Sequence, residues 1–149
     1  MLIIAHIVFD AAMPAIALYF ESSMHRAGMS TGDITKALFM VPVIYASITF
    51  LSGFIADKAG RKTTVNLFSV LCIAGYILFV AGILNGWNPY LVGAFAGLYQ
   101  GSYWIGRDYM NVMMTEKVPT DIRASVVGAE GLLVIIGLAA GYILTIVGM

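Results

Sequence analysis

Four ionisable side chains lie inside stretches of sequence that are otherwise apolar, namely Asp10, Arg107, Asp108 and Glu130. Ionisable groups within apolar helices are costly, and they usually line a polar path or pair with one another. Three carboxylates beside one guanidinium cannot all stay charged in a low dielectric, because like charges repel and burial removes their solvation. Such a cluster holds a proton, holds a cation, or has partners elsewhere. The alternative is a structural ion-pair cluster between helices, in which Glu130 simply pairs with Arg107.

These groups lie at similar depths if their segments are helices that cross a bilayer. At 1.5 Å per residue, Asp10 lies roughly 13 Å into its segment and Glu130 roughly 12 Å into its own. Arg107 and Asp108 lie roughly 12 to 14 Å before the end of theirs. One hypothesis is therefore proton coupling, with Asp10 as the carrier and Arg107 as its partner. His6 lies one turn from Asp10 on the same face, where a lone histidine is more often interfacial than a relay.

The composition indicates a membrane protein. Hydrophobic residues make up 60% of the chain and charged residues 11%, and the mean hydropathy is +0.91. Soluble domains carry about 25% charged residues. The net charge is zero, so nothing favours nucleic acid as a partner. The single cysteine, Cys72, excludes an internal disulfide and a cysteine zinc site, and nothing in the sequence indicates a cofactor.

Five segments are long enough to cross a bilayer, which takes about 20 apolar residues in a helix. The expected fold is thus an all-α membrane protein with a single transmembrane domain over residues 1–149. Proline is expected to kink the first two segments and to open the fourth at a favourable first-turn position. The five segments are residues 2–20, 34–56, 63–84, 89–115 and 122–147.

Lysine and arginine residues predict the orientation, because cytoplasmic loops carry an excess of both. Two loops, which follow the second and fourth segments, hold Lys58, Arg61, Lys62, Lys117 and Arg123. The opposite side holds Arg26 and Lys36. The first group is therefore expected to be cytoplasmic. This orientation suits a multi-pass protein of a bacterial or archaeal plasma membrane.

The loop between the second and third segments contains an acid and a glycine, Asp57 and Gly60, whose positions can be interpreted physically. Asp57 lies at the C-terminal end of a predicted helix, where the helix dipole is already negative and an acid needs a positive partner. Gly60 suits a tight turn with positive φ. A plain positive loop is the alternative interpretation.

Two motifs carry a resemblance to a known family. The segment Gly53-x-x-Ala56-Asp57-Lys58-x-Gly60-Arg61-Lys62 resembles the G-x-L-A-D-[RK]-x-G-R-[RK] signature of the major facilitator superfamily. That signature joins the second and third helices of each six-helix half. Glu116 to Arg123, with Pro119 and Thr120 between them, resembles the E-x6-R element between the fourth and fifth helices of sugar-porter-like members. Both motifs fall between the corresponding segments here, and the resemblance covers essentially all 149 residues.

The resemblance implies that the chain is five helices of one six-helix half. It also implies a cytoplasmic latch of salt bridges between the two motifs. Glu116 would face Arg61 or Lys62, and Asp57 would face Arg123 or a helix N-terminus of the other half. Sugar porters usually have glycine after the E-x6-R arginine, and this chain has Ala124, which weakens any inference of a sugar substrate.

The sequence has features that resemble each of the two six-helix halves of this family. An aspartate in the first helix opposite an arginine in the fourth resembles the N-terminal half of proton-coupled sugar porters. The lack of a cytoplasmic lead before the first segment, together with Pro119-Thr120, favours the C-terminal half.

The fourth segment carries a glycine ridge beside a polar stripe. Glycines at four-residue spacing let another helix approach closely. The ridge consists of Gly93, Gly97 and Gly101, and the stripe of Gln100, Tyr103, Arg107 and Asn111. The first and fourth helices line the central cavity in this family, so the resemblance implies that the stripe and the face of Asp10 form the substrate wall. We assign Trp104 to lipid or helix packing.

The function that these expectations favour is secondary active transport of a small solute by alternating access, with a proton as one candidate coupling ion. The partners are then membrane lipid, a small-molecule substrate and the other transporter half. The alternative is a small helical membrane protein that acts through helix–helix assembly. An enzyme is disfavoured, because His6 and His25 lack the spacing of metal ligands and no serine or cysteine has a recognisable base.

Overall fold

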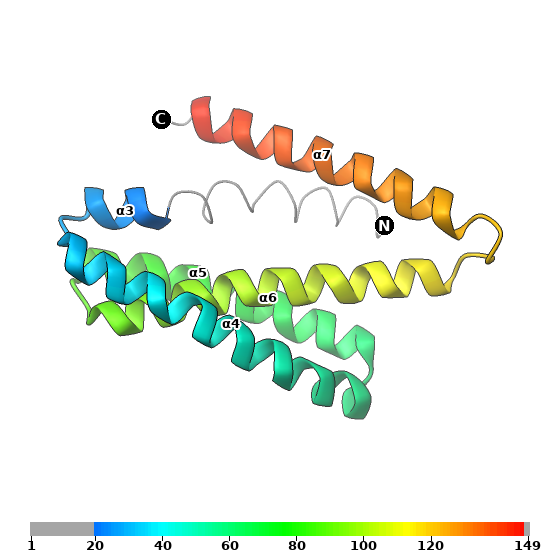
Figure 1. Ribbon diagram of the computed structural model, residues 1–149, viewed down its shortest axis with the longest axis horizontal. Helices are drawn as coiled ribbons and strands as arrows, with labels where there is room; N and C mark the ends of the chain where they lie inside the picture. Colours follow the sequence, from blue (N-terminus) through cyan, green and yellow to red (C-terminus); the bar gives the residue numbers. More distant parts are fainter. Residues whose placement is uncertain (1–19, 148–149) are drawn as a thin grey trace. The chain divides into compact units, whose positions relative to one another are not determined.

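The computed structural model describes residues 20–147, and the regular structure in this range is helical. Most of the first expected span, residues 2–20, lies outside the described residues. The helices are α3 (Phe20–Arg26), α4 (Thr31–Ala59), α5 (Arg61–Leu84), α6 (Pro89–Glu116) and α7 (Arg123–Val147) (Figure 1). The chain divides into two compact units, with Phe20–Gly106 in one and Arg107 onward in the other. Helix α6 begins in the first unit and ends in the second.

The last four predicted helices are confirmed to within three residues at each end. The largest differences, of three residues each, are at the two ends of α4, which begins at Thr31 and not near residue 34 and ends at Ala59 and not near residue 56. The earlier start is explained by an N-cap: Ser30 Oγ accepts a hydrogen bond from the Asp33 N–H at 3.2 Å and donates one to the Asp33 carboxylate at 2.8 Å. A serine cap with an acid three residues later satisfies the free donors of the first turn. Helix α3 lies where the sequence predicted a loop.

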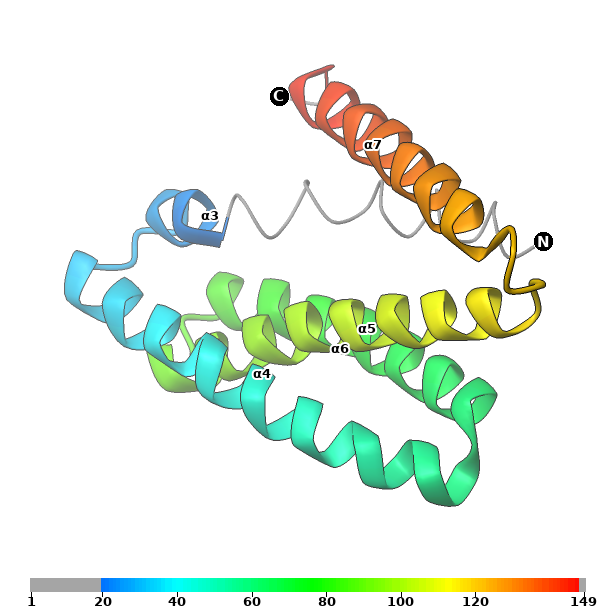
Figure 2. The same ribbon diagram turned by 45° about the vertical axis from the view of Figure 1, so that its right-hand side comes forward.

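A single residue, Gly60, connects α4 to α5, and its φ of 82° confirms the predicted positive value (Figure 2). The Gly60 N–H donates to the Ala56 carbonyl at 3.0 Å. The Gly60 carbonyl accepts from the Thr64 N–H at 3.1 Å and from the Thr64 hydroxyl at 3.0 Å. Because the turn is so short, the charged residues of the motif lie on the last turn of α4 and the first turn of α5.

Within residues 20–147, three helices are long and apolar enough to cross a membrane: α4, α5 and residues Arg123–Ile143 of α7. This finding supports the predicted membrane class. Helix α6 has 28 residues but is not among the three. Its polar and ionisable residues, including Gln100, Arg107 and Asp108, make it less apolar than its neighbours. The crossing by α6 therefore stays a prediction.

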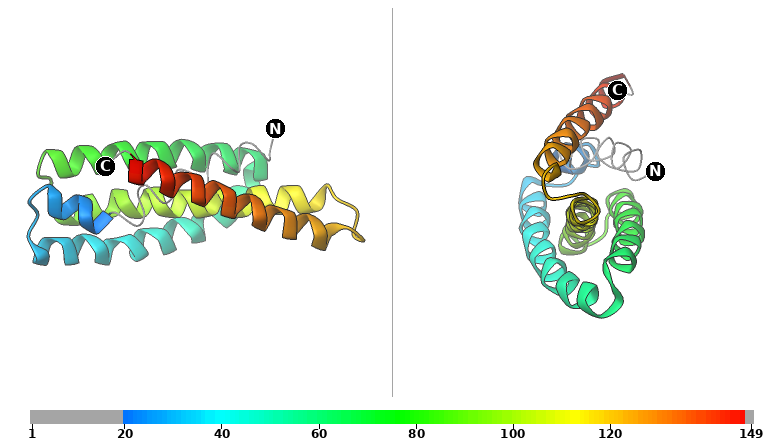
Figure 3. Two further views of the ribbon diagram at one scale, coloured as in Figure 1. Left: turned by 90° about the horizontal axis from the view of Figure 1, so that it is seen from above. Right: turned by 90° about the vertical axis from the view of Figure 1, so that its right-hand side faces the viewer.

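In the unit Phe20–Gly106, the early part of α6 lies between α4 and α5 (Figure 3). A Cβ atom added at Gly97 would lie 2.8 Å from the Val41 carbonyl oxygen, and one at Gly93 would collide with the backbone of Ala37. The predicted close approach of another helix to this ridge is therefore confirmed, and the helix is α4. On the other side, a Cβ atom at Gly75 of α5 would lie 2.7 Å from the Tyr99 nitrogen.

Aromatic rings complete the core of this unit. Phe20, the first residue of α3, packs edge-on against Phe79 at a centroid distance of 4.9 Å and against Tyr99 at 6.1 Å. All three side chains are at most 4% exposed. These contacts join α3 to α5 and α6. Together with the close contacts at Gly97 and Gly75, they fix the early part of α6 between α4 and α5.

Candidate functional site

The second unit contains a buried ion pair between two helices. Arg107 Nη2, on α6, lies 3.9 Å from Glu130 Oε1, on α7. The Glu130 side chain is 6% exposed and that of Arg107 is 19% exposed. The pairing that the sequence left open as an alternative is therefore observed. At 3.9 Å the contact is longer than a hydrogen bond, so the attraction between these atoms is chiefly electrostatic.

Asn111 and Asp108 occupy different faces of α6 beside this pair. Asn111 follows Arg107 by four residues, so the two share one face. Its amide oxygen is buried and accepts no hydrogen bond from the described residues. Asp108 is exposed. Neighbouring residues of an α-helix point about 100° apart, because one turn takes 3.6 residues. Asp108 is next to Arg107 in depth, as expected, but this rotation turns its side chain away from that of Arg107.

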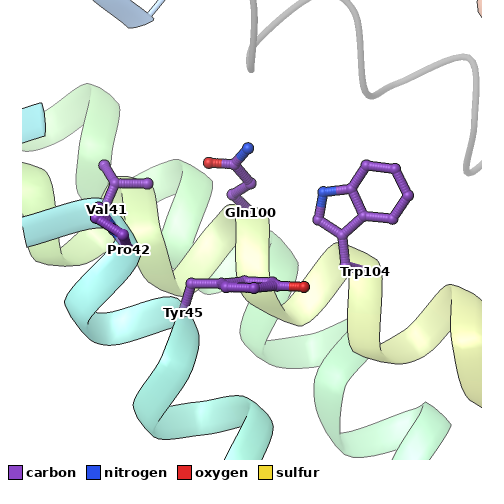
Figure 4. A pocket seen from close by; sticks show the side chains of 5 residues that line it. All are labelled: Val41, Pro42, Tyr45, Gln100 and Trp104. Atoms are coloured by element: carbon purple, nitrogen blue, oxygen red, sulfur yellow. The ribbon is translucent and has the colours of Figure 1, made fainter.

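The first unit contains a hollow of about 330 Å³ between α4 and α6 (Figure 4). The described residues that line it are Val41, Pro42, Tyr45, Gln100 and Trp104. In Figure 4 the Tyr45 phenol extends toward Trp104, and the Gln100 amide projects from α6 above Tyr45 and to the left of Trp104. Two aromatic rings, one amide and an aliphatic edge suit a small solute that has both polar and apolar faces.

The predicted polar stripe of α6 is divided by this geometry. Gln100 lines the hollow, whereas Tyr103 is 3% exposed and is not among the described residues that line it. Tyr103 instead packs edge-on against Trp104, with ring centroids 5.3 Å apart. Trp104 therefore packs against another side chain, as the sequence suggested, and it also lines the hollow. The signal was present in the sequence, because Trp104 follows Gln100 by four residues and so shares its face.

The first loop motif lies at the surface of its unit. Asp57, Lys58, Gly60, Arg61 and Lys62 are all exposed. No described atom lies within 4 Å of a Cβ built at Gly53.

The second motif belongs to the other unit. Glu116 ends α6 and Arg123 begins α7, and both are exposed. Arg123 donates to the Val118 carbonyl at 3.4 Å, and the Pro119 carbonyl accepts from the Ile122 N–H at 3.3 Å. The turn between α6 and α7 is therefore hydrogen-bonded within itself. Because the two motifs lie in separate units, the salt bridges expected between them stay a prediction.

The remaining site residues expected from the sequence, His6 and Asp10, lie outside the described residues. Their approach to Arg107 stays a prediction. Comparison of the chain with protein-family models, with curated proteins and with solved structures finds no match.

Proposed function

We propose that the chain is part of a secondary active transporter, which moves a small solute across the membrane by alternating access. The observation that carries the proposal is the Arg107–Glu130 pair, which is buried between helices of an apolar chain. Apolar residues of similar volume often stabilise a protein as well as a buried ion pair does. Stability alone is therefore a poor reason for this pair, whereas intramembrane ionisable residues commonly mark a solute or ion pathway.

The loop motifs support the same class of protein. The turn at Gly60 presents one acid and three bases at the joined ends of two apolar helices. This arrangement suits the proposed cytoplasmic latch, in which Glu116 and Arg123 pair with charges of the first motif or of a second transporter half. In this proposal the chain is one half of a major-facilitator-like transporter, and the hollow at Gln100 and Trp104 contributes to its solute wall.

Assembly through helix–helix contacts is the second candidate. The glycine ridge of α6 (Gly93, Gly97 and Gly101) does not favour assembly, because α4 of the same chain already covers this ridge. The observation that favours it lies on α7, where a Cβ atom at Gly128 or at Gly131 would meet no described atom within 4 Å. A second copy of the chain packed there would support assembly, and cross-linking between copies through cysteines placed at these two positions would detect it.

The test of the proposal is a transport screen with the complete gene that encodes this chain. Membrane vesicles are given radiolabelled sugars, organic acids, peptides or drugs, with and without a pH gradient. We expect gradient-driven uptake of one class, loss of uptake in Arg107→Gln, and normal uptake in Ile135→Val, a control at an exposed apolar position of α7. Uptake no greater than in vesicles without the protein, for every class, would contradict the proposal.

Two further results are expected from the same system. The chain by itself, reconstituted in liposomes, should not transport, because alternating access requires two halves that move around a shared midplane site. If Asp10 carries the proton, Asp10→Asn should abolish uphill uptake but leave solute exchange intact. Unchanged uphill uptake in that variant would assign the proton to another group.

A further inference from the structure

The hollow between α4 and α6 presents two polar groups that have no partner in the described part of the chain. No hydrogen bond joins the Tyr45 hydroxyl or the Gln100 amide to another described residue. Figure 4 shows both side chains at the hollow, with the Gln100 amide above the Tyr45 ring. Polar groups away from water are costly unless they are paired, so a ligand that pairs with these two would be stabilised here.

The hollow lies near the middle of both helices. Tyr45 is the middle residue of α4 (Thr31–Ala59), and Gln100 and Trp104 lie on either side of the middle of α6 (Pro89–Glu116). In the proposed transporter both helices cross the bilayer, so the hollow is close to the midplane, where transporters bind their solutes. A lipid acyl chain does not suit this position, because it would leave the amide and the hydroxyl unpaired.

Packing holds the two aromatic rings of the hollow in place. Trp104 packs edge-on against Tyr103 with ring centroids 5.3 Å apart, and Tyr103 is 3% exposed. A Cβ atom at Gly101 would lie 3.0 Å from a ring carbon of Tyr45, so the glycine lets this ring lie against α6. Flat rings stack favourably on such aromatic side chains. A site whose side chains are already ordered loses little conformational entropy when a ligand binds.

The described lining of the hollow carries no charge. On α6, the nearest charged residue after Trp104 is Arg107, which belongs to the second unit and approaches Glu130 to 3.9 Å. On α4, the nearest charged residue before the hollow is Lys36, which pairs with Asp33 at 2.9 Å. A charged solute would therefore leave water without gaining a counter-charge from the described lining, which is costly.

The chemistry of the lining defines the solute. A glutamine amide offers an acceptor oxygen beside two donor hydrogens, so it pairs with an acceptor that lies next to a donor. We infer that the hollow binds a neutral, planar solute whose edge carries such a pair, as a carboxamide or a cyclic amide does. The rings of Tyr45 and Trp104 contact its flat faces, and Gln100 pairs with its edge. The inference rests on the proposed transport function and names its solute class.

Size and hydrogen bonding support this class over a polyol. The volume of about 330 Å³ is near the lower end of the roughly 300 to 1,000 Å³ that ligand pockets span, which suits a solute of one or two rings. A hexose carries more hydroxyl groups than the described side chains of the hollow could pair, and each unpaired polar group weakens binding.

The test is ligand-observed fluorine NMR with the purified complete protein in lipid nanodiscs, and empty nanodiscs correct for partition into lipid. The probes are para-fluorobenzamide, para-fluorobenzoate and para-fluorobenzamidinium, which share one ring and differ in charge, together with a fluoroglucose. We expect the benzamide to bind, and the two charged probes to bind at least roughly tenfold more weakly, because their charge lacks a partner. The fluoroglucose should also bind more weakly than the benzamide.

Variants of the lining connect this binding to the hollow. Gln100→Met removes the amide with little change in volume and should weaken binding of the benzamide roughly tenfold. Trp104→Phe should weaken it roughly three- to tenfold, since it reduces the stacking surface. The chain has one other tryptophan, Trp87, which packs against Phe95 at a centroid distance of 6.0 Å and is not among the described lining residues. Trp87→Phe is therefore the matched control and should leave the affinity unchanged.

Several results would overturn the inference. They are a benzamide that does not bind, a charged probe or the fluoroglucose that binds as tightly as the benzamide, and an affinity that Gln100→Met leaves unchanged. The comparison of probes uses the wild-type protein, so it stands even if a variant does not fold. Binding needs no gradient and no turnover. A transport screen without any uptake therefore contradicts the proposed function, whereas preference for a charged probe contradicts the inference alone.

Discussion

Replacement of Gly97 by alanine tests the packing that holds α6 in place. The new Cβ would lie 2.8 Å from the Val41 carbonyl oxygen and 3.0 Å from Ile44 Cβ, both inside the 3.4 Å at which ordinary van der Waals contact begins. The nearest of these atoms is backbone, so rotation of a side chain cannot relieve the clash. Overpacking of this kind typically costs about 1 to 3 kcal/mol of unfolding free energy.

A matched control is available on α4. Gly53 lies in the same unit and in a helix, and a Cβ atom there would meet no atom of residues 20–147 within 4 Å. Both substitutions gain the higher helix propensity of alanine, about 0.5 to 1 kcal/mol. The difference between Gly97→Ala and Gly53→Ala therefore isolates the contact between α4 and α6, and we expect it to be about 1 to 3 kcal/mol.

The assay is unfolding of the purified protein in mixed micelles, with helicity followed by circular dichroism as the fraction of denaturing detergent rises. Gly97→Ala should unfold at a lower fraction than the wild type, and Gly53→Ala at the same fraction or a higher one. Gly93→Ala, which meets the Ala37 backbone still more closely, should be the least stable of the three. Equal midpoints for Gly97→Ala and Gly53→Ala would refute the claim that the glycine ridge sets the distance between α4 and α6.

Three other predictions concern the turn, the ion pair and the orientation. Gly60→Ala should lower the free energy of unfolding by about 1 to 3 kcal/mol, because residues with a side chain rarely adopt a φ of 82°. A melting temperature equal to that of the exposed control Ala59→Ser would contradict this. Arg107→Gln and Glu130→Gln should each lower the free energy of unfolding by about 3 to 5 kcal/mol, since each leaves a buried charge. The double variant should regain most of this loss. Additive losses in a double-mutant cycle would show that the two side chains do not interact. In a Cys72→Ala background, a membrane-impermeant maleimide added to intact cells should label Asn85→Cys and not Lys58→Cys, and the reverse pattern would invert the proposed orientation.

Local features of the fold were predictable from the sequence because they depend on short-range chemistry. Four helices were placed to within a few residues, since long apolar runs bounded by glycine, proline and polar residues have few other conformations in a bilayer. The positive φ of Gly60 followed from its position between two helices. The close approach at Gly97 followed from four-residue spacing, which puts small residues on one face.

The tertiary structure decided which of these residues meet. Four-residue spacing predicted that some helix would pack on the α6 ridge, but only the fold shows that it is α4, because spacing along one helix carries no information about its neighbour. The same reason applies to Glu130: its depth made several partners possible, and the contact between α6 and α7 selected Arg107. Rotation about the helix axis separated Asp108 from that pair and brought Trp104 to the hollow beside Gln100. The sequence alone thus determined the helices and their short connections and predicted the membrane class, whereas the packing of one helix face on another decided which polar groups lie together.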